Sequence, residues 1–132
     1  MGYYQEFYKV TKEYISKRNK KYIEYDIVSE FIKPFIDYNC FEFRKVVENL
    51  NIDKQFIYEY DNNIKLVLNK ENIEKGKKML EQSLKEAIYN RAINDDEACG
   101  IVERCTYLLR KLDEILLMFD FSKYFILYCD SI

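Results

Sequence analysis

The side chains that most often carry enzyme chemistry are scarce in this sequence. The chain has no histidine, so the commonest general base and metal ligand is absent. Without histidine, neither a Ser–His nor a Cys–His nucleophilic pair can be built. The glycines Gly2, Gly76 and Gly100 are isolated from one another, whereas a phosphate-binding loop needs several close together. These absences predict a protein that is not an enzyme.

Four cysteines, Cys40, Cys99, Cys105 and Cys129, are the remaining candidates for chemistry. No two of them have CxxC spacing, and the first residues lack the apolar stretch of a signal peptide. We interpret them as reduced, mostly buried thiols of a cytosolic protein. The alternative is a zinc site of four thiolates, which the spacing does not favour. We therefore predict no metal and no cofactor.

Two clusters of charge have ordinary structural explanations. The acids Asp95, Asp96 and Glu97 are typical of a helix N-terminus, where negative charge is stabilised. The basic segment 17–21 adjoins several tyrosines, a mixture that binds single-stranded nucleic acid in other proteins. A nucleic-acid domain usually carries a basic excess, however, and this chain has a formal net charge of −2. The pattern favours a solvated surface over a nucleic-acid interface.

The bulk composition predicts one helical domain spanning residues 1–132. A chain of 132 residues with 48% apolar residues can build one core. One proline and three glycines argue against a turn-rich β-sandwich or barrel. No apolar run approaches the roughly 20 residues that span a bilayer, so no membrane span is expected.

Apolar spacing predicts an all-α, compact bundle of six or seven helices. The clearest element runs from Asp95 to Phe119, where apolar residues recur at i, i+3, i+4 and i+7. Pro34 should end an earlier helix, because it lacks an N–H group and clashes with the preceding turn. The other helices are predicted at Tyr4–Arg18, Ile23–Lys33, Phe43–Leu50, Glu71–Ala92 and Phe121–Tyr128.

The segment Asp53–Asn69 allows two interpretations. Its apolar residues fit one helical face, but Phe56–Leu68 also fits two strands around an Asn-Asn turn. An isolated hairpin is marginal without a sheet to join. Since no other strands are expected, we favour a helix there.

Tyrosine is unusually abundant, with 13 copies in the chain. Its large ring and polar tip suit surfaces that a partner covers. The alternative is that codon bias in an AT-rich genome substitutes tyrosine for phenylalanine and leucine. The tyrosines we consider for a partner surface are Tyr3, Tyr4, Tyr8, Tyr58, Tyr60, Tyr89 and Tyr107.

Three segments resemble the poxvirus Bcl-2-like proteins. They are Glu13–Asn19, which carries Tyr-Ile followed by Arg-Asn, Asn72–Met79 at the start of a long helix, and Leu109–Tyr128. Lys17 departs from the tryptophan often found in this family, and the Asn-Trp-Gly-Arg motif of cellular Bcl-2 proteins is absent.

The resemblance implies a Bcl-2-like bundle with a central fifth helix. It also implies a non-enzymatic viral protein of the infected host cell's cytoplasm, which antagonises innate immune signalling through NF-κB, apoptosis or both. Its partners would be host signalling or pro-apoptotic Bcl-2 family proteins, or a second copy in a homodimer. A helix-binding groove would have as walls Phe43, Val47, Phe56, Tyr60, Leu80 and Leu84. A dimer or partner face on the first and sixth helices would contain Tyr4, Tyr8, Tyr107 and Arg110.

Two other functions are kept as alternatives. One is a small helical inhibitor from a phage or mobile element, which would be favoured if the acids gathered on one face. The other is a helical nucleic-acid-binding module. Lysines are interleaved with the acids along the whole chain, which counts against the first.

Overall fold

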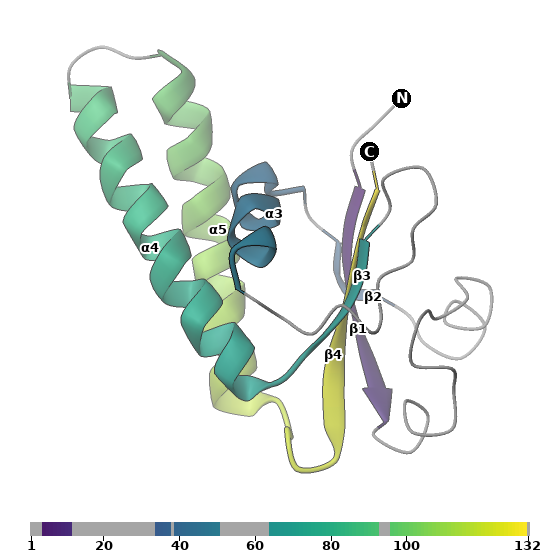
Figure 1. Cartoon of the computed structure of the whole chain (residues 1–132). Helices are drawn as coiled ribbons and strands as arrows, with labels where there is room; N and C mark the ends of the chain where they lie inside the picture. The colour runs from purple at the N-terminus through teal and green to yellow at the C-terminus, as the bar shows by residue number, and fades with distance from the viewer. Residues whose placement is uncertain (1–3, 12–33, 38, 51–63, 93–95, 132) are drawn as a thin grey trace. The chain divides into compact units, whose positions relative to one another are not determined.

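A computed structural model describes residues 4–11, 34–37, 39–50, 64–92 and 96–131 of the chain (Figure 1). Within these ranges the chain alternates between strands and helices. The elements are β1 (Tyr4–Thr11), β2 (Pro34–Asp37), α3 (Phe41–Glu48), β3 (Ile64–Leu68), α4 (Lys70–Ala92), α5 (Asp96–Met118) and β4 (Tyr124–Ser131).

The prediction of an all-α bundle of six or seven helices is wrong. Tyr4–Thr11 was expected to begin the first helix and is β1, and most of the expected last helix is β4. Both segments are short, and helical and extended periodicity cannot be told apart over so few residues. The two strands pair with each other over their full lengths, although they are far apart in the sequence. The Bcl-2-like arrangement with a central fifth helix is overturned with the bundle.

The described residues form two compact units. The first unit contains the four strands, and the second contains the three helices. The chain enters the helical unit twice, once for α3 and once for the consecutive helices α4 and α5.

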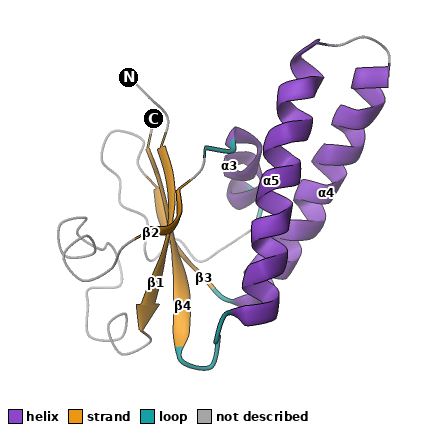
Figure 2. Cartoon of the chain, turned by 180° about the vertical axis from the view of Figure 1, so that it is seen from behind, coloured by secondary structure: helices purple, strands orange, loops and turns teal. Residues whose placement is uncertain are grey.

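The four strands form an antiparallel sheet with the order β2-β1-β4-β3 (Figure 2). β1 and β4 pair along their full lengths, from Tyr4 opposite Ser131 to Thr11 opposite Tyr124. Pro34, which was expected to stop a helix, begins β2 at the edge of the described sheet. Such a position suits proline, because no ladder hydrogen bond is lost there. A register shift between Phe7 and Tyr8 marks an irregularity in the β1–β2 pair.

Both faces of the central strands carry buried side chains. Alternate residues of a strand point to opposite faces. Phe7 is buried on one face and meets Tyr128 edge to face, with ring centroids 5.3 Å apart. On the other face, a buried cluster is formed by Tyr8, Val10, Leu127 and Cys129, with the partly buried Val67 and Phe125 against it.

A buried polar network crosses the β1–β4 pair. The Gln5 side-chain amide donates to the Tyr128 hydroxyl at 2.7 Å, and this hydroxyl donates to Asp130 at 2.6 Å. All three residues are buried. The Gln5 backbone N–H also donates to the Asn39 side chain at 2.9 Å. Polar groups removed from water must be hydrogen-bonded to avoid a large penalty, so this network favours the observed register of β1 on β4.

The helical unit bears out three of the predicted helices. α5 matches the helix expected from Asp95 to Phe119, α4 matches Glu71–Ala92, and α3 matches the helix expected around Phe43–Leu50. α4 and α5 run antiparallel, and α3 packs against both (Figure 1). Lys77 of α4 forms an ion pair with Asp113 of α5, with 2.5 Å between Nζ and Oδ1.

The ambiguous segment Asp53–Asn69 ends in a strand. Ile64–Leu68 is β3, which pairs with β4, so the favoured helix is wrong at these residues. The first half of the alternative hairpin lies outside the described residues, as does the helix predicted at Ile23–Lys33.

The described helices were also compared with the length and hydropathy that a bilayer requires. Neither α4 nor α5, the two longest, has the apolar stretch needed to cross a membrane, and neither does α3.

Replacing Tyr128 with phenylalanine tests the buried polar network. Tyr128→Phe removes the hydroxyl that links Gln5 to Asp130, and we expect it to lower the free energy of unfolding by about 1–3 kcal/mol. Urea denaturation measures the change. Tyr124→Phe is the matched control, because Tyr124 is on the same strand but only partly buried, and it should change stability by less than about 0.5 kcal/mol. Equal stability of both variants and the wild type would contradict the role of the network.

Gly76 lies inside α4, where glycine costs helix stability. A Cβ atom at this position would stand 3.4 Å from the Phe43 ring and 3.6 Å from Val46, which are ordinary contacts. We therefore expect Gly76→Ala to raise the free energy of unfolding by about 0.5–1 kcal/mol. Gly76→Leu should instead destabilise the protein, because its larger side chain has no room beside α3. Thermal unfolding of both variants provides the measurement, and a destabilising alanine would show that α3 packs more tightly than described.

Candidate functional site

A cluster of reactive side chains joins α3 to α5 within the helical unit. Cys40 is the N-cap residue of α3, and its carbonyl accepts the Phe43 N–H at 3.0 Å. Glu42 follows in the first turn of α3. Arg104 and Cys105 are consecutive residues of α5. Both cysteines are fully buried. Two thiols from the α3 and α5 segments therefore lie beside the Glu42 carboxylate and the Arg104 guanidinium.

Arg104 holds the Glu42 carboxylate with two hydrogen bonds. Its Nη2 donates to Oε1 at 2.6 Å, and its Nε donates to Oε2 at 3.2 Å. This fork-to-fork geometry fixes the direction of the carboxylate as well as its charge. Gly100 contributes by leaving space, because a Cβ atom there would stand 3.0 Å from Arg104 Nη1.

In the Arg104–Glu42 ion pair, the pKa of each group is shifted in the direction that favours its charged form. Burial alone would raise the pKa of the Glu42 carboxyl, but the hydrogen bonds and charge of Arg104 outweigh burial and lower it. The hydrogen bonds to Glu42 raise the pKa of the Arg104 guanidinium. Glu42 is therefore an anion that faces the two thiols.

The two thiols differ because they share a hydrogen bond. The hydrogen bond to Cys105, together with burial, raises the pKa of the Cys40 thiol well above its usual value. The same hydrogen bond lowers the pKa of Cys105, and the nearby Arg104 charge adds to this effect. Cys40 donates its thiol proton to Glu42 Oε2 at 3.6 Å, and Cys105 is the thiol whose pKa is lowered.

Three of these groups could act as metal ligands. The Cys40 and Cys105 sulfurs and a Glu42 carboxylate oxygen all lie within 4.8 Å of one another. The Cys40 sulfur is 3.6 Å from Glu42 Oε2. Arg104 donates hydrogen bonds to the same carboxylate and is not itself a metal ligand.

No known family model, curated protein or solved structure matches this chain. What the cluster does must therefore be inferred from its own residues and their surroundings. What the surfaces of the helical unit bind must likewise be inferred from their own residues.

The sequence predicted the thiols but missed their association. Three of the four cysteines are buried, and Cys99 is exposed. Cys40 and Cys105 are 65 positions apart, and only the packing of α3 on α5 brings them together. The sequence did offer one sign of this association. An anionic residue, Glu42, follows soon after Cys40, and a cationic residue, Arg104, directly precedes Cys105.

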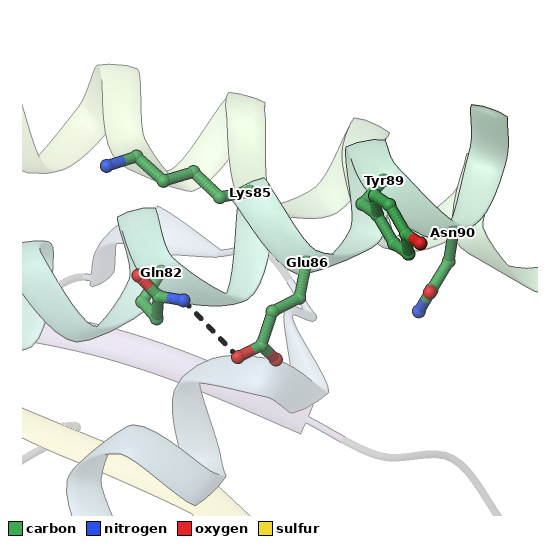
Figure 3. A pocket seen from close by; sticks show the side chains of 5 residues that line it. All are labelled: Gln82, Lys85, Glu86, Tyr89 and Asn90. Atoms are coloured by element: carbon green, nitrogen blue, oxygen red, sulfur yellow. Dashed lines mark hydrogen bonds between the residues drawn. The ribbon is translucent and has the colours of Figure 1, made fainter.

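A second feature of the helical unit is a hollow on the outward side of α4 (Figure 3). It has a volume of about 430 Å³. Tyr89, which is 68% exposed, forms its apolar part. The polar lining consists of Gln82, Lys85, Glu86 and Asn90. Gln82 donates to Glu86 at 3.4 Å, and the Tyr89 and Asn90 side chains project side by side (Figure 3).

The residues predicted to line a helix-binding groove occupy other places. Phe43 and Val47 of α3 and Leu80 of α4 are buried in the core, so no partner helix can reach them without opening it. Leu84 of α4 is half-buried. Phe56 and Tyr60 lie outside the described residues.

The predicted dimer or partner face is divided between a strand and a helix. Tyr4 and Tyr8 belong to β1, and Tyr8 is only 2% exposed, so its ring is not available to a partner. The side chain of Tyr4 is outside the described part of the structure. Tyr107 and Arg110 are both exposed on α5, and the Lys111 ammonium stands 5.7 Å from the centre of the Tyr107 ring. Of the four residues predicted for this face, Tyr107 and Arg110 are described as exposed.

Removing the Arg104 guanidinium should destabilise the helical unit. Arg104→Met keeps the apolar stem but leaves the Glu42 carboxylate, whose side chain is only 12% exposed, without its cation. We expect a loss of about 1–3 kcal/mol in the free energy of unfolding, reduced somewhat because Arg104 itself is partly exposed. Arg104→Lys should recover only part of this loss, because an ammonium cannot form the bidentate pair.

The matched control for Arg104 is Lys75→Met. It removes the same charge from a helical pair in which Lys75 and Glu71 are 60% and 70% exposed, and it should cost only about 0.3–0.5 kcal/mol. Urea denaturation compares the variants. A similar cost for both substitutions would mean that the Arg104–Glu42 pair behaves as an ordinary surface pair.

Proposed function

We propose that this protein is a non-enzymatic protein-binding module, and that it binds through the outward face of α4. The observation that supports this proposal is Tyr89, an aromatic ring left 68% exposed at a shallow depression that is open to solvent and has polar neighbours. Tyrosine is enriched among the residues that dominate binding energy, particularly where polar neighbours surround it. Tyr89 was among the tyrosines that the sequence singled out for a partner surface.

The polar lining carries donors, acceptors and both signs of charge. Lys85 and Glu86 are adjacent on α4, and both are exposed. A partner that fits this surface must offer the opposite charges in the opposite order, and an apolar or amide group for the Tyr89 ring.

A second copy of the same helix meets these requirements. When two α4 helices pack antiparallel about a twofold axis between residues 85 and 86, Lys85 of each copy faces Glu86 of the other. The same axis places Gln82 of one copy opposite Tyr89 of the other. A twofold contact is self-complementary by definition, and α4 offers 23 residues, or about 34 Å, for the pairing. The proposed partner is therefore a second copy of this chain.

Exchanging the two charges tests this contact directly. Lys85→Glu places two like charges opposite each other, and we expect at least about a tenfold weaker dimer at low salt. The double variant Lys85→Glu/Glu86→Lys restores complementarity and should recover most of the affinity. Tyr89→Ala should weaken the dimer by at least about thirtyfold, as expected of a central anchor. Sedimentation equilibrium of the purified chain measures all of these constants.

Tyr107→Ala is the matched control, because Tyr107 is an exposed tyrosine on α5. It should leave association unchanged. If Tyr107→Ala dissociates the dimer and Tyr89→Ala does not, the contact is on α5 instead. A wild-type chain that stays monomeric up to about 0.5 mM would overturn the proposed partner, since weaker association falls outside the range of specific assembly.

Antagonism of host NF-κB or apoptotic signalling stays a prediction. It depended on a resemblance whose expected bundle and groove differ from the fold described above, and so does the expected place in the cytoplasm of an infected host cell. The α4 surface carries the binding proposal without that resemblance.

A further inference from the structure

We propose that Cys40, Glu42 and Cys105 form a zinc-binding site that fastens the N-terminus of α3 to the middle of α5. These residues offer two sulfurs and one oxygen to a common point. Sulfur donors combined with a carboxylate favour zinc over magnesium or calcium, which prefer oxygen ligands alone. The site is independent of the outward face of α4.

The distances are close to those of a tetrahedral zinc site. With bonds of about 2.3 Å to sulfur and about 2.0–2.2 Å to oxygen, neighbouring ligand atoms stand about 3.3–3.8 Å apart. The Cys40 sulfur and Glu42 Oε2 already have a separation of 3.6 Å. The three donor atoms lie within 4.8 Å of one another, so each must move by less than about 1 Å to reach a shared ion.

The charges of the cluster balance when zinc is bound. Two thiolates and one carboxylate bring three negative charges, which Zn²⁺ and the Arg104 guanidinium together neutralise. Both thiol protons leave to solvent when the ion binds. A buried site with no net charge avoids most of the cost of placing ions away from water.

Residues that hydrogen-bond to a metal ligand commonly fix its orientation, and Arg104 has this role for Glu42. It holds the Glu42 carboxylate through bonds of 2.6 Å and 3.2 Å. A carboxylate has enough lone pairs to accept these bonds and to bind a metal with the face that points to the cysteines. Arg104 therefore acts as a positioning residue for the site.

The ligands also stand on elements that are already ordered. Cys40 and Glu42 flank the first turn of α3, and Cys105 lies inside α5, a helix of 23 residues. Cys40, Glu42 and Cys105 supply three of the four ligands that zinc usually has in proteins. Since both thiols are fully buried, we infer a structural role for the ion within the helical unit.

Cobalt titration of the purified, fully reduced chain tests the proposal. Co²⁺ takes the place of Zn²⁺ and gives visible bands typical of tetrahedral coordination, with near-ultraviolet bands from thiolate ligands. We expect one Co²⁺ per chain, displaced by one equivalent of Zn²⁺, and a thermal unfolding midpoint that rises with added Zn²⁺ because the ion binds only the folded state.

Single substitutions assign the ligands. Cys40→Ser and Cys105→Ser should each abolish the thiolate bands, and Glu42→Gln should weaken binding by at least about tenfold. Cys99→Ser is the matched control, because Cys99 is an exposed thiol six residues before Cys105 on the same helix. It should bind cobalt like the wild type.

The wild-type chain decides the proposal even if a variant fails to fold. Absence of cobalt bands from the reduced wild-type chain at micromolar metal would overturn it. So would equal loss of binding in Cys99→Ser. Conversion of the Cys40–Cys105 pair to a disulfide under mild peroxide, without any metal binding, would instead identify the cluster as a thiol pair and not a metal site.

Discussion

β1 and β4 pair along eight residues each, although they stand near opposite ends of the chain. The three described helices between them lie outside the sheet, and the chain returns to the sheet after them to form β4. β4 has two partners, β1 on one side and β3 on the other, so it joins β3 to the rest of the described sheet. Gln5, Tyr128 and Asp130 form their polar network across this same pair. The sheet therefore depends on the register in which β1 pairs with β4.

The helices could be predicted from the sequence because their signal is local. The apolar stripes of α4 and α5 extend over 23 residues each, long enough for a period of 3.6 to be distinguished from a period of two. α3 has only eight residues, but Phe43, Val46 and Val47 mark its buried side. What the sequence predicted for these segments is what the chain forms.

The strands could not be predicted because their partners are distant. Tyr124–Cys129 is a continuous apolar run, as expected of a strand buried on both faces, and such a run is equally compatible with a helix. Ile64–Leu68 was recognised as a possible strand and rejected, since no sheet was expected for it to join. β3 pairs only with β4 among the described strands, so a sequence that predicts helices at β1 and β4 offers no partner strand for Ile64–Leu68.

The two candidate sites differ in the same way, because one could be predicted from local sequence and the other depends on distant contacts. Tyr89 could be found from the sequence, because an aromatic residue on the polar side of a predictable helix is visible in the periodicity alone. The group of Cys40, Glu42, Arg104 and Cys105 could not, because nothing in the order of residues says that the first turn of α3 meets the middle of α5. Spacing rules for metal sites describe ligands from one loop or one hairpin, whereas this pair of thiols comes from two separate helices.

The order β2-β1-β4-β3 also has a consequence for synthesis on the ribosome. Chains emerge from the N-terminus at roughly 5–20 residues per second, and β4 is made after every other described element. Until it appears, β3 and one side of β1 expose unpaired backbone groups that can associate with other chains. α4 and α5 are complete before that moment and have mostly local contacts, which form fast. The nascent protein thus presents a folded helical unit and an incomplete sheet until β4 emerges, so a chaperone would matter most before that step.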